Sequence, residues 1–251
     1  MRQARVLTAE FLGTFALTFF GAGAICADAL LRTTPAGVLP FGPADLLLVA
    51  TAHAMALGVM VTGLGHISGA HFNPAVTFAA AMARKIEPVL AVLYVVTQLV
   101  GGLVAALLLR YVFPEAVTKV VNLGAPTLTP GFGVLHGVVI EAVLTFFLVT
   151  VVFATAIDPR GAFGKIAGFG IGFVLFFDIL MGGPITGAAM NPARAFGPAL
   201  LGGAMNLPHF ALYWAGPLIG AVAAGALYEA VLIHEPEDVA TDVPPPSKEA
   251  L

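Results

Sequence analysis

One short sequence occurs twice in this chain, and it restricts the possible folds more than any other feature. Residues 67–78 read ISGAHFNPAVTF, and residues 185–196, 118 positions later, read ITGAAMNPARAF. Seven of the twelve positions match, with Asn-Pro-Ala at the centre of both copies. Asn is a favoured helix N-cap, and Pro fits the first helical position, where its missing N–H has no intrahelical partner. We therefore predict that one helix begins directly after Asn73 and another after Asn191.

Composition places these two helices in a membrane. Of the 251 residues, 59% are hydrophobic and only 10% are charged, whereas about 25% of the residues in soluble domains are charged. Six apolar stretches reach the roughly 20 residues that are needed to cross about 30 Å of hydrocarbon. They lie near residues 7–31, 45–64, 88–112, 134–157, 164–183 and 208–233. The net charge of −3 without a basic stripe argues against nucleic acid as a partner.

The two segments that follow Asn-Pro-Ala are too short to span the bilayer. Residues 74–83 and 192–201 are apolar, but a ten-residue helix is only about 15 Å long. Such a segment enters the membrane without crossing it. The expected chain therefore has six transmembrane helices and two re-entrant half-helices.

A second repeat shows how the two halves are related. TAEFLGTF and VIEAVLTF share Glu-x-x-x-Thr-Phe, which places Glu10 and Glu141 at matching points of two three-span halves. Three is an odd number of spans, so the second half is inserted upside down. Inverted repeats with broken helices meet at the membrane midplane. We predict an all-α membrane protein whose channel domain, residues 1–233, contains inverted repeats of about 5–115 and 134–233, with Asn73 and Asn191 facing each other.

The distribution of basic residues predicts the orientation. Arg2, Arg5, Arg84, Lys85, Arg160 and Lys165 fall on one side of the six spans, and Arg32, Arg110 and Lys119 fall on the other. By the positive-inside rule, both termini are cytoplasmic. Residues 234–251 are acidic and rich in Pro, which predicts a disordered cytoplasmic tail. In the absence of a targeting signal, we expect a multi-pass protein of the cell membrane.

The loops before the half-helices have a composition suited to a pore. Backbone at membrane depth must be buried in protein or line a water-filled cavity, and small residues let it run beside a lumen. The predicted lining backbone is that of Gly69, Ala70, His71, Phe72, Gly187, Ala188, Ala189 and Met190. Two helix N-termini carry about half a positive charge each, and two Asn amides offer donors to a water oxygen. Such a path passes neutral, hydrogen-bonding molecules and repels cations and protons.

With these features the chain resembles the aquaporin family over about residues 5–233. The resemblance is carried by the two boxes, Asn73-Pro74-Ala75 and Asn191-Pro192-Ala193, by the continuation NPARAFGPAL, and by the matched Glu10 and Glu141. It implies a homotetramer with one pore per subunit. It also implies that the two Asn side chains donate to passing water, and that the two Glu side chains hold the re-entrant loops through backbone amides.

The same resemblance assigns the narrowest ring of the pore. Offsets from the boxes give His53, Ile179, Ala188 and Arg194, a set that is similar to the filter of plant tonoplast-type aquaporins. An aliphatic Ile179 and the loss of an aromatic ring predict a wider, more amphipathic filter than that of strict water channels. Water should pass, and hydrogen peroxide, ammonia or urea are the plausible further solutes. Glycerol is disfavoured, because Ala195 follows Arg194 where glycerol-conducting members typically have Asp. The case for ammonia as a solute is weakened, because the loop LGAPTLTPGFG lacks the histidine that ammonia-conducting relatives have.

Several alternatives stay open at this stage. A coupled secondary transporter also uses inverted repeats and broken helices, and Asp178, beside Ile179, is the acid that best fits such a carrier. His71 either faces the cytoplasmic half of the pore or caps loop carbonyls, while His136, His209 and His234 are expected at the membrane interface. Gln98 is assigned to helix packing. No set of residues indicates an enzyme, a metal site or a cofactor.

Overall fold

The computed structural model describes residues 2–158, 160 and 166–233 and is almost entirely helical. The tail expected at residues 234–251, with His234, lies outside the described residues. The long helices are α1 (Arg2–Leu31), α2 (Pro43–Ser68), α4 (Pro88–Val112), α6 (Val134–Val152), α7 (Ala167–Thr186) and α9 (Leu207–Leu227). The shorter elements are β1 (Thr33–Thr34), β2 (Gly37–Val38), α3 (Pro74–Met82), α5 (Glu115–Val120), η1 (Asn122–Gly124), η2 (Phe153–Ile157), α8 (Pro192–Gly202) and η4 (Tyr228–Leu232).

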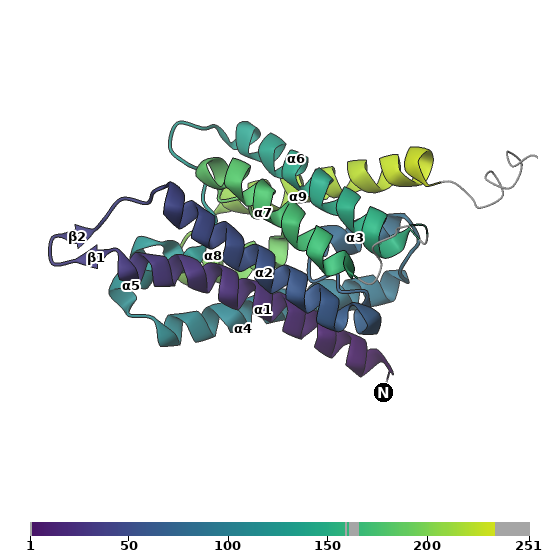
Figure 1. Cartoon of the computed structure of the whole chain (residues 1–251), viewed down its shortest axis with the longest axis horizontal. Helices are drawn as coiled ribbons and strands as arrows, with labels where there is room; N and C mark the ends of the chain where they lie inside the picture. Colours follow the sequence, from purple (N-terminus) through teal and green to yellow (C-terminus); the bar gives the residue numbers. More distant parts are fainter. Residues whose placement is uncertain (1, 159, 161–165, 234–251) are drawn as a thin grey trace, which may run out of the picture.

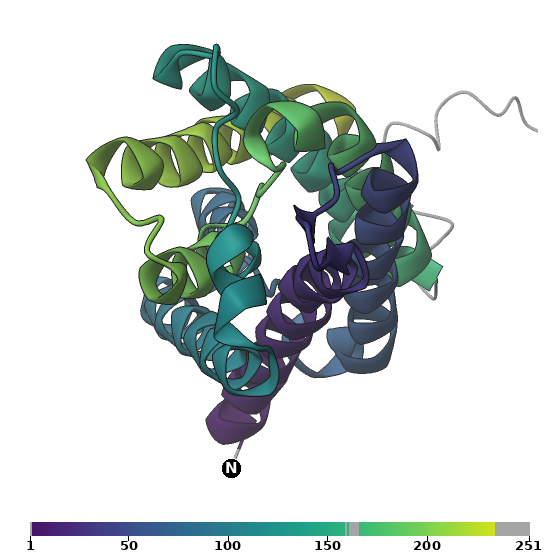
Figure 2. The same ribbon diagram turned by 90° about the vertical axis from the view of Figure 1, so that its left-hand side faces the viewer.

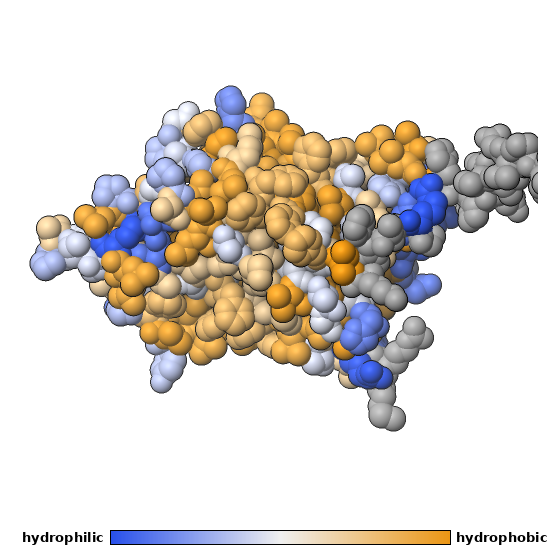
Figure 3. All heavy atoms as spheres, viewed as in Figure 1, coloured by the Kyte–Doolittle hydropathy of each residue, from blue (hydrophilic) through white to orange (hydrophobic). Residues whose placement is uncertain are grey.

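Six of these helical segments are long and apolar enough to cross a membrane. On the face shown in Figure 3, hydrophobic side chains form a broad band across the middle of the molecule, and hydrophilic ones gather at its two ends. The N-terminus and the end of α9 lie at the same end, opposite the β1–β2 hairpin and α5 (Figure 1). The predicted fold class, with six spans and two half-helices, is confirmed.

The two halves interlock through their half-helices. Within each half the first span packs on the third, as α1 on α4 and α6 on α9, and α2 packs on α7 across the boundary. Each half-helix contacts the third span of the other half, α3 on α9 and α8 on α4. The helices form a ring when the molecule is viewed from the hairpin end (Figure 2). This exchange brings the N-termini of α3 and α8 together inside the ring.

Close approach of α2 and α7 depends on glycine. A Cβ added at Gly58 would lie 2.8 Å from the Gly168 carbonyl oxygen, so the two backbones touch at this crossing. Small residues allow such contacts between membrane helices, where packing and not the hydrophobic effect holds helices together.

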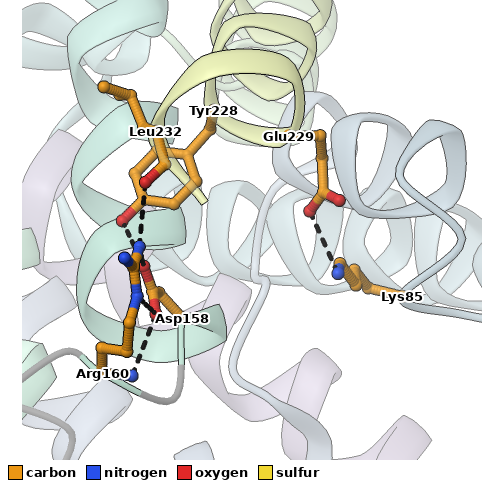
Figure 4. Close-up of polar contacts among 6 residues, drawn as sticks. All are labelled: Lys85, Asp158, Arg160, Tyr228, Glu229 and Leu232. Carbon is orange, nitrogen blue, oxygen red and sulfur yellow. Dashed lines mark hydrogen bonds and ion pairs between the residues drawn. The ribbon is translucent and has the colours of Figure 1, made fainter. Parts of the chain in front are cut away.

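Polar contacts tie the helix ends together at the N-terminal end of the molecule. Asp158 and Arg160, which follow α6, contact Tyr228 and Leu232 at the end of α9 (Figure 4). The π-helical turns η2 and η4 directly follow α6 and α9, and the bonded groups lie in or just after these turns.

Candidate functional site

Each half-helix begins where the sequence predicts, at an Asn-Pro step. The Asn73 side-chain oxygen accepts from the backbone N–H of Ala75 at 2.8 Å. In the second copy the Asn191 oxygen accepts from both Ala193 and Arg194, at 3.0 and 3.1 Å. Both Asn residues have extended φ angles, as N-cap residues do.

The two Asn side chains also bond the opposite half. Asn73 Nδ2 donates to the Met190 carbonyl at 2.8 Å, and Asn191 Nδ2 donates to the Phe72 carbonyl at 2.8 Å. An amide NH2 group carries two hydrogens, so each Asn keeps one hydrogen beyond this bond. The paired half-helix starts are therefore held face to face with donors to spare.

The loop backbone before each half-helix is strained in the same way in both copies. Ala70 and Phe72 have φ angles of 52° and 49°, and Ala188 and Met190 have 46° and 50°. Positive φ is uncommon for residues with a Cβ and costs of order 1–3 kcal/mol each where the surrounding structure enforces it. The carbonyls of Phe72 and Met190, which the two Asn residues bond, belong to this strained backbone.

In the first half, a buried carboxylate holds the strained loop. Glu10 Oε1 accepts from the His71 N–H at 3.0 Å and from the Ser68 hydroxyl at 2.7 Å. Its Oε2 accepts from the Phe72 N–H at 2.7 Å and from Gln98 Nε2 at 2.8 Å. Gln98 therefore contributes a hydrogen bond to the loop support, beyond the helix packing that the sequence indicated.

The second half repeats this arrangement with fewer partners. Glu141 Oε1 accepts from the Thr186 hydroxyl at 2.7 Å and from the Ala189 N–H at 2.9 Å, and Oε2 accepts from the Met190 N–H at 2.7 Å. Glu10 and Glu141 are both fully buried. Bonds to loop amides thus offset the burial of both carboxylates.

A narrow cavity runs past the two Asn side chains, Asn73 and Asn191. Its volume is ≈ 20 Å³, and about 10–15 Å³ of this kind of volume holds one water molecule. The polar lining comes from His53, His71, Asn73, Asn191 and Arg194, and the apolar lining from Leu17, Leu57, Val61, Ala70, Val76, Leu148, Val152, Ile171, Leu175, Ala188 and Ala189. The cavity is therefore sized for water and has polar groups along an otherwise apolar wall.

At one end of the cavity, His53 and Arg194 bond each other. Arg194 Nη2 lies 2.9 Å from His53 Nε2, and His53 Nδ1 lies 2.8 Å from the Val49 carbonyl. A carbonyl only accepts and a guanidinium only donates. This network assigns the hydrogen of His53 to Nδ1, so the ring is neutral and its Nε2 lone pair is occupied by Arg194.

A loop that the sequence distinguished only by its lack of a histidine also reaches Arg194. Nη1 donates to the Gly124 carbonyl at 3.0 Å, and Gly124 belongs to the connection between α5 and α6. Asn122, Leu123 and Gly124 all have positive φ, which turns this stretch toward the cavity. The only sequence signal was the run of Gly, Pro and Thr in LGAPTLTPGFG, which is typical of any loop.

The predicted filter residue Ile179 and its neighbour Asp178 are placed differently from the other three filter residues. Ile179 is buried in the apolar core and does not appear in the lining of the cavity, whereas His53, Ala188 and Arg194 do. Asp178 is 2% exposed and its Oδ2 has no hydrogen-bond partner among the described residues.

At the other end, His71 connects the narrow cavity to a wide one. It lines both the narrow cavity and a vestibule of ≈ 1020 Å³. Its Nδ1 lies 3.1 Å from the Thr77 hydroxyl and its ring contacts the edge of Tyr94. Of the two interpretations of His71, the position facing the pore agrees with this placement.

His209 lies in the first turn of α9, near a span end as its sequence context indicated, and it is also buried and hydrogen-bonded. The side chain is 8% exposed, and its Nε2 lies 3.1 Å from the Pro126 carbonyl. His136 on α6 is exposed, as expected for a residue near the end of a span.

Comparisons with known proteins agree with this fold and geometry. The sequence pattern of the family described as major intrinsic protein matches residues 1–228. The chain is 44% identical over 245 residues to "Probable aquaporin TIP3-2" of Arabidopsis thaliana, covering 96% of this chain and 89% of that protein. It is 42% identical to "Aquaporin TIP1-2" of Zea mays, over 92% of this chain and 87% of that protein.

Solved structures extend the comparison to the fold. The X-ray structure of the aquaglyceroporin from Plasmodium falciparum superposes with a TM-score of 0.77, at 23% identity, over 92% of this chain and 97% of that one. At this identity the likeness concerns the fold alone. Together with the family match over residues 1–228, these relatives identify the chain as a multi-pass membrane channel of the major intrinsic protein family.

Proposed function

We propose that this channel passes water and small neutral solutes passively and excludes ions and protons. The observation that carries the proposal is the pair of Asn amides, Asn73 and Asn191, that are fixed by opposite loops beside a cavity of ≈ 20 Å³. Each amide retains one N–H for a passing oxygen. A water molecule that loses its neighbours in so narrow a space regains hydrogen bonds from these donors.

Ion exclusion follows from the charges around the cavity. Arg194 is 2% exposed, and its guanidinium stays protonated at physiological pH. The N-termini of α3 and α8 add partial positive charge at the centre. A cation therefore meets positive potential at two levels and finds few acceptors to replace its hydration shell.

The proposed solute range depends on where Arg194 lies. Its two terminal nitrogens are bonded to His53 and to Gly124, which hold the side chain against the wall of the ring. Ala188, which lines the same cavity, adds little bulk. We expect urea and hydrogen peroxide to pass along with water, ammonia less readily, and glycerol poorly.

The proposed assembly and location start from the outer surface of the helices. Many apolar side chains remain exposed on the outer faces of the helices, among them Met55, Val59, Phe169 and Phe173 along α2 and α7. Such faces suit lipid or neighbouring subunits. We propose a homotetramer in the cell membrane with both termini cytoplasmic, and protease access to a C-terminal tag in intact cells tests the orientation.

The carrier alternative relied on Asp178. This residue is not among the described residues that line the narrow cavity, and the relatives named above are aquaporins. A carrier needs an ion-binding group in the path of its substrate. Passive flow therefore agrees better with the geometry.

Stopped-flow light scattering on proteoliposomes tests the proposal. Vesicles are challenged with an impermeant osmolyte, then with urea and with glycerol, and an internal pH dye reports ammonia and proton flux. Fast water flow with a low activation energy and no proton leak is the expected result. Water flow equal to that of empty vesicles would contradict the proposal.

The filter assignment has its own test in the same assay. His53→Phe combined with Ile179→His adds an aromatic ring and moves the histidine across the pore, so urea flow should fall relative to water flow. An unchanged urea-to-water ratio in this double variant would count against His53 and Ile179 as filter residues.

A further inference from the structure

The connection between α5 and α6 reaches the filter through one carbonyl. Gly124 O accepts from Arg194 Nη1 at 3.0 Å, and Gly124 itself packs tightly, because an added Cβ would lie 2.6 Å from the Ala22 carbonyl oxygen. The position of Arg194 in the ring therefore depends on where this connection lies.

Hydrogen bonds at two residues, Pro126 and Thr129, hold the chain just beyond Gly124, and one of them is donated by the Thr129 hydroxyl to the Pro184 carbonyl at 2.8 Å. The Pro126 carbonyl accepts from His209 Nε2 at 3.1 Å, and the Thr129 N–H donates to the Ile185 carbonyl at 2.9 Å. Proline has no N–H, so the carbonyl is the only backbone hydrogen-bonding group that Pro126 can offer. The side chain of His209 is the hydrogen-bond partner of this carbonyl, and Pro126 lies two residues after Gly124.

His209 is itself held rigidly at the start of α9. Asn206 caps this helix by accepting from the His209 N–H at 2.8 Å. The imidazole ring packs against Tyr213, one turn later, with centroids 4.4 Å apart. Because Nε2 meets a carbonyl it carries the hydrogen, and the buried Nδ1, which has no partner among the described residues, is left as the acceptor of a neutral ring.

The neighbouring Tyr213 binds the other loop of the filter. Its hydroxyl donates to the Thr186 carbonyl at 2.5 Å, directly before Gly187. The two loops touch there, since an added Cβ at Gly187 would lie 2.9 Å from Pro126. Successive turns of α9 thus hold both backbone segments that surround Arg194, one through His209 and one through Tyr213.

We propose that His209 is a positioning residue for solute selectivity: by fixing Pro126 it keeps the Gly124 carbonyl in place, and so keeps Arg194 against the wall of the ring. The role rests on the proposed channel function. Without this bond the Gly124 carbonyl moves away from Arg194, which retains His53 alone and enters the lumen more often. The ring then narrows, and urea, which is larger than water, is affected more.

Three substitutions of His209 separate positioning from packing. His209→Phe retains an aromatic ring against Tyr213 but removes the donor. His209→Asn keeps a polar amide that is too short to reach Pro126, and His209→Gln places an amide N–H near the position of Nε2. The quantity to measure is the urea-to-water permeability ratio in proteoliposomes, with His136→Phe, at an exposed position, as the matched control.

We expect the ratio to fall about fivefold in the Phe and Asn variants, the factor that corresponds to one net hydrogen bond, and to stay near wild type in the Gln variant and in the control. If Phe fails to fold, the Asn and Gln pair decides. Equal ratios in Asn and Gln, or a wild-type ratio in Phe, would overturn the proposal. Absent water flow in the wild type would instead overturn the channel function, so the two failures are distinguishable.

Discussion

The loops before the two half-helices, residues 69–73 and 187–191, adopt the same backbone and carry different chemistry. Each has positive φ at the same three positions, and each ends in an N-cap Asn. Three residues after the cap, however, the first half has Val76 and the second has Arg194. Inverted symmetry therefore accounts for the half-helices, while the charge at one end of the cavity is a departure from symmetry.

Other polar residues along the cavity also have an apolar residue at the matching position of the other half. His53 on α2 corresponds to Ile171 on α7, and His71 corresponds to Ala189, each pair separated by 118 residues. All four line the narrow cavity. Each histidine thus has an apolar counterpart. The repeated backbone forms the pore, and the side chains that differ between the halves make its two ends different.

The two supporting carboxylates differ as well. Glu10 accepts from Gln98, a side chain whose Oε1 has no partner among the described residues. Beside Glu141 the third span instead has Gly216, where an added Cβ would lie 2.7 Å from the Glu141 Cβ. The first half therefore has an adjustable neighbour, and the second half has none in that position.

Glu141→Gln should have the largest effect and should break the equivalence of the halves. An amide has one acceptor oxygen, so the N–H of Ala189 or Met190 would face an NH2 group. Hydrogen bonds to charged groups contribute about 1.5–3 kcal/mol each. We expect the free energy of unfolding to fall by about 3 kcal/mol or more, and we expect water flow to be lost. Thermal unfolding in detergent and stopped-flow permeability measure the two effects.

Glu10→Gln is the matched substitution in the first half and should cost less. There Gln98, which donates to Glu10 Oε2 and to the Thr77 hydroxyl, can give up its bond to Thr77, turn its amide and present Oε1 to the new NH2 group. Glu115→Gln serves as the control, because Glu115 is exposed on α5 and pairs with Lys119 at 2.8 Å. Equal losses for Glu10→Gln and Glu141→Gln would show that Gln98 does not adapt.

The sequence alone predicted the parts of this comparison that depend on local signals. Asn-Pro steps at residues 73 and 191 mark helix starts because capping involves only the next few residues. Span number follows from apolar length, and the inverted relation follows from an odd number of spans. Each of these inferences needs no knowledge of which distant residues meet.

The parts that escaped prediction all depend on contacts between distant segments. Gly124 reaches Arg194 across 70 residues, and His209 reaches Pro126 across 83. A Gly in a loop and a His near a span end are both common, so neither carries a local signal for its partner. Gln98 was read as a packing residue for the same reason, since its bond to Glu10 joins two different spans.

Arg194→Val should sharpen the comparison by giving the second half the residue of the first. At an effective dielectric constant of about 20, a unit charge about 6 Å from a cation raises its energy by about 3 kcal/mol, or roughly 100-fold in rate. We expect proton and cation leak to rise toward that factor while water flow persists. A pH dye in proteoliposomes measures the leak.

Arg194→Lys retains the charge and is the control for this variant. This variant should still exclude ions, although a lysine cannot donate to His53 and Gly124 at the same time as the planar guanidinium does. Intact proton exclusion in Arg194→Val would assign the barrier to the N-termini of α3 and α8 instead.

Asp158→Asn should have the smallest effect, and it compares the ends of α1 and α6. Both helices end near an Asp–Arg pair, Asp28 with Arg32 at 2.7 Å and Asp158 with Arg160 at 2.6 Å. The second pair also joins α9, since Tyr228 donates to Asp158 at 3.0 Å and Arg160 donates to the Leu232 carbonyl at 2.8 Å (Figure 4). The bonds from Arg160 hold the pKa of the Asp158 carboxyl below its ordinary range.

The sign of the pH dependence follows from that direction. A carboxyl whose pKa is lower in the folded state stabilises the fold above its unfolded pKa, near 3.9, and the contribution is lost as the pH falls through the folded pKa. Wild-type protein should therefore lose more thermal stability than Asp158→Asn between pH 6 and pH 3, values chosen to bracket that unfolded pKa. Because the Arg160 side chain is 41% exposed, solvent screens the pair and keeps the difference small. Parallel curves for the two proteins would show that the link from α6 to α9 depends on Tyr228 and packing, and that the charge of Asp158 contributes nothing to it.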